Sequence, residues 1–253
     1  QTGGVEEAHG IDGAYRIIHE AGFDAADANI DHLYSYQAIV NHQSVPAFDA
    51  SDKDCLEYFR PWKEAAEKYG FSLYTACKST AVQLPEGKRC NTLTVTELFA
   101  RPRETLVIDI AKLKTHGMMG YSGAVKNLFG VVPGQLKPEL HSRYPEKEPF
   151  AEMLVDLCEY VHPDFSIIDA IDAMEGDGPT GGQKRFVGAL VGSESPYEAD
   201  MVGAKLIDMK PEEILVLKNA QERRRGHAPS ARPAPILLVL IVLVNNLIIC
   251  VVI

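Results

Sequence analysis

The chain has 253 residues, of which 46% are hydrophobic and 24% are charged, so its composition is that of a folded globular protein. Its 25 basic and 35 acidic residues give a formal net charge of -10. This charge argues against a nucleic-acid partner, which would require a basic face.

The five cysteines, Cys55, Cys77, Cys90, Cys158 and Cys250, are scattered and form no CxxC pair. Scattered thiols are typical of a reducing compartment, so we expect a cytoplasmic protein.

The first segment, residues 1–76, alternates helical and strand patterns. Helix, strand, helix and strand are predicted in turn over Ile11–Ala21, Phe23–Asp27, Lys53–Tyr69 and Phe71–Tyr74. Gly22 and Gly70 follow the two helices at the position where glycine commonly ends a helix. This order predicts an N-terminal βα fragment.

The second segment, residues 77–226, has stronger strand patterns. Strands are predicted over Thr105–Ile110, Phe165–Ala170 and Phe186–Val191, and helices over Glu148–Val161, Pro196–Ile207 and Pro211–Gln221. Glycine-rich loops are expected over Gly117–Gly134 and Gly176–Gly182. The segment therefore predicts an α/β domain, with a mostly parallel sheet and flanking helices.

The third segment, residues 227–253, is a linker followed by an apolar tail. Apart from Asn245 and Asn246, the tail Ile236–Ile253 is apolar, and as a helix it would span about 27 Å of a hydrocarbon core about 30 Å thick. Arg223–Arg225 precede it, as in a C-terminal membrane anchor with a cytoplasmic body. We expect such a tail to contact a membrane through 236–253 and not to pack into the α/β core. A misassembled end of the reading frame is the alternative.

A dense polar constellation follows the predicted strand Thr105–Ile110. It contains Lys112, Lys114, His116, Gly123, Lys126, Asn127, Lys137 and His141. In open α/β sheets ligands bind beyond the carboxyl ends of the strands, and glycines let backbone N–H groups approach an anion. We expect Lys114 and His116, on the same side of an extended chain, to be catalytic. The other six residues are expected to bind an anionic small molecule or cofactor. A solvated basic loop is the alternative.

A second constellation follows the predicted strand Phe165–Ala170. Four carboxylates, Asp169, Asp172, Glu175 and Asp177, lie beside a glycine-rich turn. They could bind a hard cation or face the lysines as a general acid–base pair, and we expect Glu175 and Asp177 to be catalytic. Turn geometry alone is the competing explanation, and it is favoured for Asp172.

Both constellations resemble a known family. The runs Ala111–His116, Ser122–Gly134, Phe150–Asp156 and Met174–Gly181 are similar to the family catalogued as domain of unknown function 362, over about residues 81–226. The resemblance implies an α/β domain and an iron–sulfur centre, which a ferredoxin-like module or electron partner often carries. The clustered cysteines of that module are absent from this sequence.

The first segment resembles another family. Gly13–Asp24 and Phe59–Gly70 are similar to the opening of a sugar phosphate isomerase/epimerase barrel of the xylose-isomerase-like type. Two or three βα units cannot close an eight-stranded barrel. Because this resemblance ends near residue 77, where the other begins, fusion or misassembly of two genes would explain both, and the chain is expected to be a chimera or a fragment.

Three interpretations of function remain open at this point. The first is a redox or iron–sulfur-associated enzyme that binds an anionic small molecule in a Lys/His/carboxylate cleft. The second is a sugar isomerase fragment that uses a divalent metal, and the third is a membrane-tethered binding or scaffold protein.

Overall fold

The computed structural model describes residues 27–28, 68, 72–73, 79–104, 106–133, 136–179, 181–225, 237–243 and 246–250. The chain forms two compact units that interleave along the sequence. The first unit consists of Gln1–Val82, Leu93–Ala100 and Gly130–Arg143, and the second of Gln83–Thr92, Arg101–Phe129 and Tyr144–Ile253. The candidate site described below belongs to the second unit.

Short elements make up the described part of the first unit. Strand β1 (Asp27–Ala28) pairs in parallel with β2 (Ser72–Leu73), which lies inside the predicted strand Phe71–Tyr74. Strands β3 (Ser79–Gln83) and β4 (Thr92–Thr96) form another two-stranded sheet. The 3-10 helix η1 (Glu97–Phe99) and helix α5 (Lys137–Arg143) follow in the sequence. The predicted helix Ile11–Ala21 and most of Lys53–Tyr69 lie outside the described residues.

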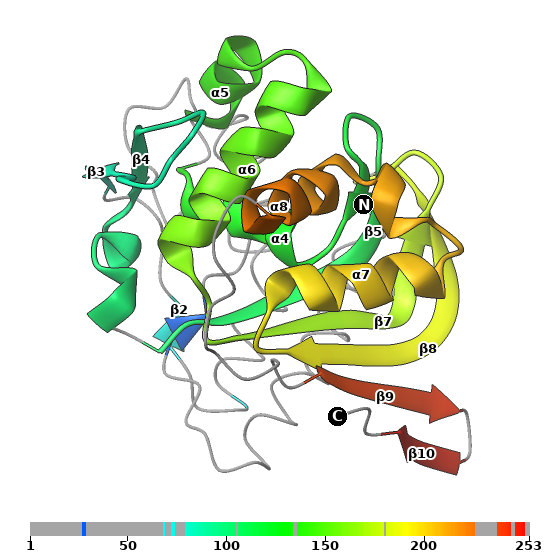
Figure 1. Ribbon diagram of the computed structural model, residues 1–253. Coiled ribbons are helices and arrows are strands. Elements are labelled where there is room, and N and C mark those ends of the chain that lie inside the picture. Colours follow the sequence, from blue (N-terminus) through cyan, green and yellow to red (C-terminus); the bar gives the residue numbers. More distant parts are fainter. Residues whose placement is uncertain are drawn as a thin grey trace, which may run out of the picture. The chain divides into compact units, whose positions relative to one another are not determined.

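The second unit is built on a mixed sheet with the strand order β10-β9-β8-β7-β5-β6 (Figure 1). Its strands are β5 (Ile108–His116), β6 (Gly120–Ser122), β7 (Phe165–Glu175), β8 (Gln183–Ser193), β9 (Leu237–Leu243) and β10 (Asn246–Cys250). Only β5 and β7 pair in parallel in this sheet, and each of its other ladders is antiparallel.

The prediction of a mostly parallel sheet is therefore wrong. A parallel connection needs a crossover of a dozen or more residues, whereas the loop between β7 and β8 is only Gly176–Gly182. The predicted strands Phe165–Ala170 and Phe186–Val191 both extend toward this loop, so they form a hairpin. The long connection from β5 to β7 contains helices and does return in parallel.

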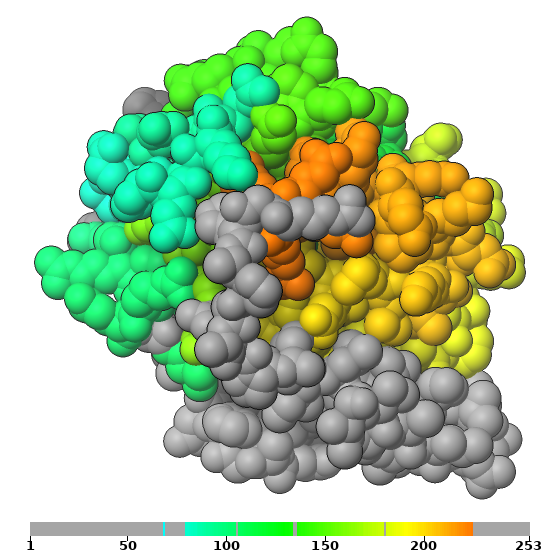
Figure 2. All heavy atoms as spheres, viewed as in Figure 1, coloured from blue at the N-terminus to red at the C-terminus, as the bar shows by residue number. Residues whose placement is uncertain are grey.

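Helices of the second unit cover one face of the sheet (Figure 1). They are α4 (Ala124–Asn127), α6 (Lys147–Val161), α7 (Pro196–Leu206) and α8 (Leu215–Arg225), with short 3-10 turns η2 (Pro102–Glu104) and η5 (Pro211–Glu213). The 3-10 turn η3 (Leu128–Val131) begins in the second unit, and its last two residues belong to the first. The prediction of α6 and α7 is confirmed to within one residue at each end. In the space-filling view, α7 and α8 form one continuous stretch of surface (Figure 2).

Alternation along β5 divides its side chains between the two faces of the sheet. Asp109, Ala111 and Leu113 are buried toward the helices, and the Leu113 side chain approaches Gly203 of α7. Lys112, Lys114 and His116 therefore point to the opposite face. Because β5 continues through His116, these three residues lie within the strand and not in a loop after it.

The apolar tail forms strands and not a helix. β9 pairs with β8 from Ala189↔Ile241 to Ser193↔Leu237, and β10 pairs with β9. The expected helical anchor and its separation from the core are therefore wrong, because the tail satisfies its backbone hydrogen bonds by extending the sheet. Within the described residues, no helix is both long and apolar enough to cross a membrane.

Candidate functional site

Charged residues gather on the sheet face that points away from the helices. Lys112 and Asp169 are register partners on β5 and β7, and the Lys112 Nζ lies 3.2 Å from Asp169 Oδ2. The side chains are only 12% and 3% exposed. Removing one partner of such a buried ion pair leaves an uncompensated charge, at a cost of about 3–5 kcal/mol.

Further charged residues continue this face toward the ends of the strands. The Lys184 Nζ on β8 lies 2.9 Å from Asp172 Oδ2 on β7, with side-chain exposures of 45% and 24%. Lys114 is buried and is in register with Met174. We call Lys112, Lys114, His116, Asp169, Asp172 and Lys184 the charged face. It changes from buried to half-exposed along β7.

Two irregularities in the sheet shape the charged face. The β5–β7 register shifts between Lys112 and Lys114, and the β7–β8 register shifts between Ala170 and Asp172. Asp169 Oδ1 accepts a hydrogen bond from the Ile171 N–H, 2.9 Å away, at this point. Bulges redirect side chains and are common beside functional sites.

Hydrogen bonds join the end of β5 and the residue after it to the loop that follows β7. Thr115 Oγ1 donates to the Gly176 carbonyl at 2.9 Å, and the Gly117 N–H donates to the Gly178 carbonyl at 3.0 Å. A Cβ at Gly178 would collide with the Thr115 carbonyl, so this approach requires glycine. Both Glu175 and Asp177 are exposed, and the Glu175 carboxylate lies 3.7 Å from Arg185 Nη1.

His116 has a fixed ring orientation at the end of β5. Its Nδ1 accepts hydrogen bonds from the Met118 and Met119 N–H groups, each 3.2 Å away. A neutral His116 therefore carries its proton on Nε2, which leaves that atom as a hydrogen-bond donor.

Gly123 and the start of α4 bind an anion of the chain itself. The Asp200 carboxylate on α7 accepts from the Ala124 N–H at 2.6 Å and the Val125 N–H at 3.0 Å. A Cβ at Gly123 would collide with Asp200 Oδ1 and the Tyr121 hydroxyl. Gly123 thus makes room for an internal carboxylate.

Lys126 and Asn127 lie on the helix side of the sheet. The Lys126 Nζ is 4.7 Å from the centroid of the Phe129 ring, and Asn127 Nδ2 donates to Asp109 Oδ1 at 2.7 Å. Lys114 points to the opposite face. The sheet therefore separates residues that we expected to face one cleft.

Lys137 and His141 lie on α5, in the first compact unit. Lys137 is buried, and burial lowers the pKa of its ammonium group well below its usual value. Their expected part in a common site stays a prediction.

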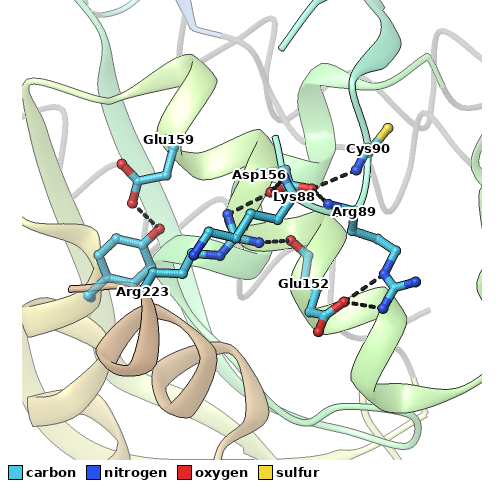
Figure 3. A network of polar contacts seen from close by, with 8 residues as sticks. Lys88, Arg89, Cys90, Glu152, Asp156, Glu159 and Arg223 are labelled. Carbon is cyan, nitrogen blue, oxygen red and sulfur yellow. Dashed lines mark hydrogen bonds and ion pairs between the residues drawn. The ribbon is translucent and has the colours of Figure 1, made fainter. Parts of the chain in front are cut away.

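The sequence analysis missed three buried acids, Asp109, Asp156 and Asp200. Asp156 accepts from the Lys88, Arg89 and Cys90 N–H groups at 2.9, 2.7 and 2.7 Å (Figure 3). Arg223 Nη1 donates to the same carboxylate at 2.6 Å. The available signal was an acid among the apolar residues of a predicted helix for Asp156 and Asp200, and of a predicted strand for Asp109.

No metal site is present among the described residues, where no three His, Cys, Asp or Glu side chains gather closely enough to hold an ion. Cys90 and Cys158 are free and buried thiols. The residues described here thus do not fit an iron–sulfur cluster, and the four carboxylates of the second constellation do not form a cation site.

The fold and the charged face define an α/β protein with a candidate ligand-binding surface on its sheet. The chain belongs to the family described as Domain of unknown function (DUF362), whose family model matches residues 39–205. This confirms the resemblance of the second segment. The match begins inside residues 1–76, and the isomerase resemblance and the boundary at residue 77 stay predictions.

One curated relative is a thylakoid-associated protein of Synechocystis sp., which is 38% identical over 127 residues. The aligned part is 50% of this chain and 39% of the relative, so the chain spans well under half of the relative's length. No solved structure matches the chain.

Proposed function

We propose that the protein binds a small anionic molecule on the charged face. The observation that carries this proposal is the buried Lys112–Asp169 pair, which continues into Lys114, Lys184 and Asp172 on the same face of the sheet. An apolar sheet face would avoid the desolvation cost of these charges, and charges retained at such a cost mark candidate functional sites.

The charge balance and the position favour an anion. Among the described residues, the charged face carries three lysines and two aspartates, and the His116 Nδ1 accepts two backbone N–H groups. The face runs from the middle of the parallel pair β5 and β7 towards the carboxyl ends of these strands, and α/β proteins commonly bind ligands beyond such ends. We further propose that a bound ligand exchanges a proton with His116, whose ring is oriented by two backbone N–H groups. No redox step follows from it.

The test compares Lys114→Met and Lys184→Met with the parent in calorimetric titrations of inorganic phosphate and acetate at fixed ionic strength. Methionine keeps most of the stem volume and removes the charge. We expect at least one of the two anions to bind the parent, and each variant to bind it about tenfold more weakly, which corresponds to about 1.4 kcal/mol. Lys205→Met, an exposed lysine on α7, is the matched control and should bind as the parent does.

Because Lys184 is half-exposed, its replacement should leave folding intact even if the Lys114 variant is unstable. Parent-like affinity in both site variants would contradict the proposal. So would an equal loss in the Lys205 control, or no binding of either anion by the parent.

We also propose that the protein associates with a membrane, because the Synechocystis relative is named as a thylakoid-associated protein. Sedimentation of the full chain with anionic lipid vesicles tests this. Recovery of all the protein in the supernatant, at low and at high salt, would refute it.

A further inference from the structure

Helix α4 is held at both ends by buried carboxyl groups from other elements. At its start, Asp200 of α7 accepts from the Ala124 and Val125 N–H groups and from the Tyr121 hydroxyl, which lies 3.1 Å away on β6. At its end, Asn127 donates to Asp109 of β5 and to the Ile110 carbonyl at 3.0 Å. The two acids thereby fix the segment from β6 through α4.

These acids differ in how well they are satisfied. Asp200 is 0% exposed and has three donors around its carboxylate, whereas Asp109 is 4% exposed and has the Asn127 amide as its donor. Neither Asp109 Oδ2 nor the hydroxyl of Ser166, its register partner on β7, has a hydrogen bond of good geometry, although the Ser166 hydroxyl is near enough to lower the pKa of Asp109 slightly.

Among the residues that the structure describes, the groups that face the two acids supply no positive charge. They are Tyr121 on β6, Asn127 on α4, Ser166 on β7 and Cys158 on α6. Lys126 of α4 is nearby in sequence, but its Nζ lies over the rings of Phe129 and Phe150. No lysine or arginine is among the groups that shift the titration of either acid. This differs from Asp156, whose carboxylate is paired with Arg223.

Two uncompensated negative charges in one apolar region are unfavourable. Burial and, to a smaller extent, the nearby charge of Asp200 together raise the pKa of Asp109 to about 8, against the lowering effect of Asn127 and Ser166. Burial likewise raises the pKa of Asp200 to about 7, against the effect of its three donors. Because the acids interact, they titrate as a pair.

We propose that Asp109 and Asp200 form a proton-sensitive clamp on α4, in which the pair holds one proton near neutral pH. Asp200 is the ionised member because three donors surround its carboxylate. Asp109 carries the proton because its Oδ2 has no donor in good hydrogen-bonding geometry. Loss of that proton in alkaline solution adds a second buried charge. Water then enters around the two carboxylates and solvates the second charge, and the β6–α4 segment loosens as a result.

This device lies beside the charged face but does not depend on ligand binding. Ser122 of β6 is the register partner of Lys114, so loosening β6 would disturb the strand that carries the lysines. The clamp is tested by titration and amide exchange without a ligand, and the anion site by ligand titration, so failure of one proposal can be told apart from failure of the other.

The test uses carbon-13 NMR of the aspartate carboxyl groups and hydrogen exchange of the backbone amides in the full chain, from pH 5 to 9.5. We expect the Asp109 and Asp200 signals to titrate well above the usual range for aspartate. Exchange protection of the Ala124 and Val125 amides, corrected for intrinsic base catalysis, should fall about tenfold between pH 7 and 9.

Asp109→Asn keeps the acceptor for Asn127 and removes the second charge, so protection of α4 should persist to pH 9. The Arg89 and Cys90 amides, which donate to the arginine-paired Asp156, serve as the internal control and should show no such fall. Ordinary titration of both acids near pH 4 would overturn the proposal. An equal fall in protection in Asp109→Asn and in the parent would also overturn it. If the Asp109→Asn variant does not fold, the carboxyl titration of the parent alone tests the proposal.

Discussion

At the scale of single residues, the environment of each buried acid determines its role. Asp156 has three backbone donors and an arginine, Asp200 has three donors without a cation, and Asp109 has one side chain as its donor. The sequence showed each aspartate but none of these partners, because the contacts join residues that are 18 to 79 positions apart. By contrast, Lys112, Lys114 and His116 could be predicted to share one side, since that follows from strand alternation alone.

The raised pKa values predict an unusual dependence of stability on pH. The pKa of an aspartate in the unfolded chain is about 3.8, so the folded state binds protons at Asp109 and Asp200 more tightly than the unfolded state does. Their stabilising contribution is complete below about pH 4 and is lost as the pH rises to about 8, at up to about 1.4 kcal/mol per pH unit and group. Urea unfolding from pH 5 to 9 should show a smaller slope for Asp109→Asn, and a slope equal to that of the parent would contradict this.

Gly123 should tolerate no side chain, because a Cβ there meets Asp200 and Tyr121. We expect Gly123→Ala to lower the free energy of unfolding by roughly 1–3 kcal/mol, as overpacking does elsewhere. Gly117→Ala is the matched control, since its Cβ would lie 3.7 Å from the Gly178 carbonyl, which is ordinary contact. Equal stability of the two variants in urea would show that α4 adjusts freely.

At the scale of elements, the apolar patterns predicted where helices and strands lie better than how far they extend. Periodicity gave α6 and α7 almost to the residue, but β5 and β7 continue by six and five residues beyond their predicted ends. These extensions carry polar residues that the sequence analysis places after the predicted strands. The antiparallel direction of β8 relative to β7 could also have been predicted, because a seven-residue connection is too short for the crossover that parallel strands need.

Arg223 connects α8 to α6 and to the turn before β4. Its guanidinium donates to Asp156 Oδ1 and to the Glu152 carbonyl (Figure 3). We expect Arg223→Met to destabilise the fold by about 3–5 kcal/mol, because Asp156 remains buried without its cation. Arg224→Met is the neighbouring control, and the double variant Arg223→Met/Asp156→Asn should lose less than the sum of the single changes. Thermal and urea unfolding measure all four, and strict additivity would argue against a direct coupling.

At the scale of the whole molecule, the two compact units and the apolar tail limited the prediction from sequence most. The first unit gathers three separate stretches, a division that no local composition could reveal. The tail was misassigned because an apolar run is compatible with a membrane helix and with sheet strands, and tertiary pairing decides between them. The family assignment rests on ordered motifs, so it depended neither on the division into units nor on the structure of the tail.

The tail supplies a final prediction, which reverses the one drawn from sequence alone. Removing residues 234–253 takes away β9 and β10 and leaves β8 without its neighbour at Ala189–Ser193, where Ala189, Val191 and Ser193 are almost fully buried. Exposing this edge and its backbone groups should lower the thermal midpoint by at least about 4 °C and favour edge-to-edge association. Removing only residues 246–253 takes away β10, which pairs with β9, so the midpoint should fall less. Calorimetry and light scattering compare the two truncations with the full chain. A midpoint that is unchanged in the longer truncation, together with higher solubility, would show that the tail contributes nothing to the sheet in solution.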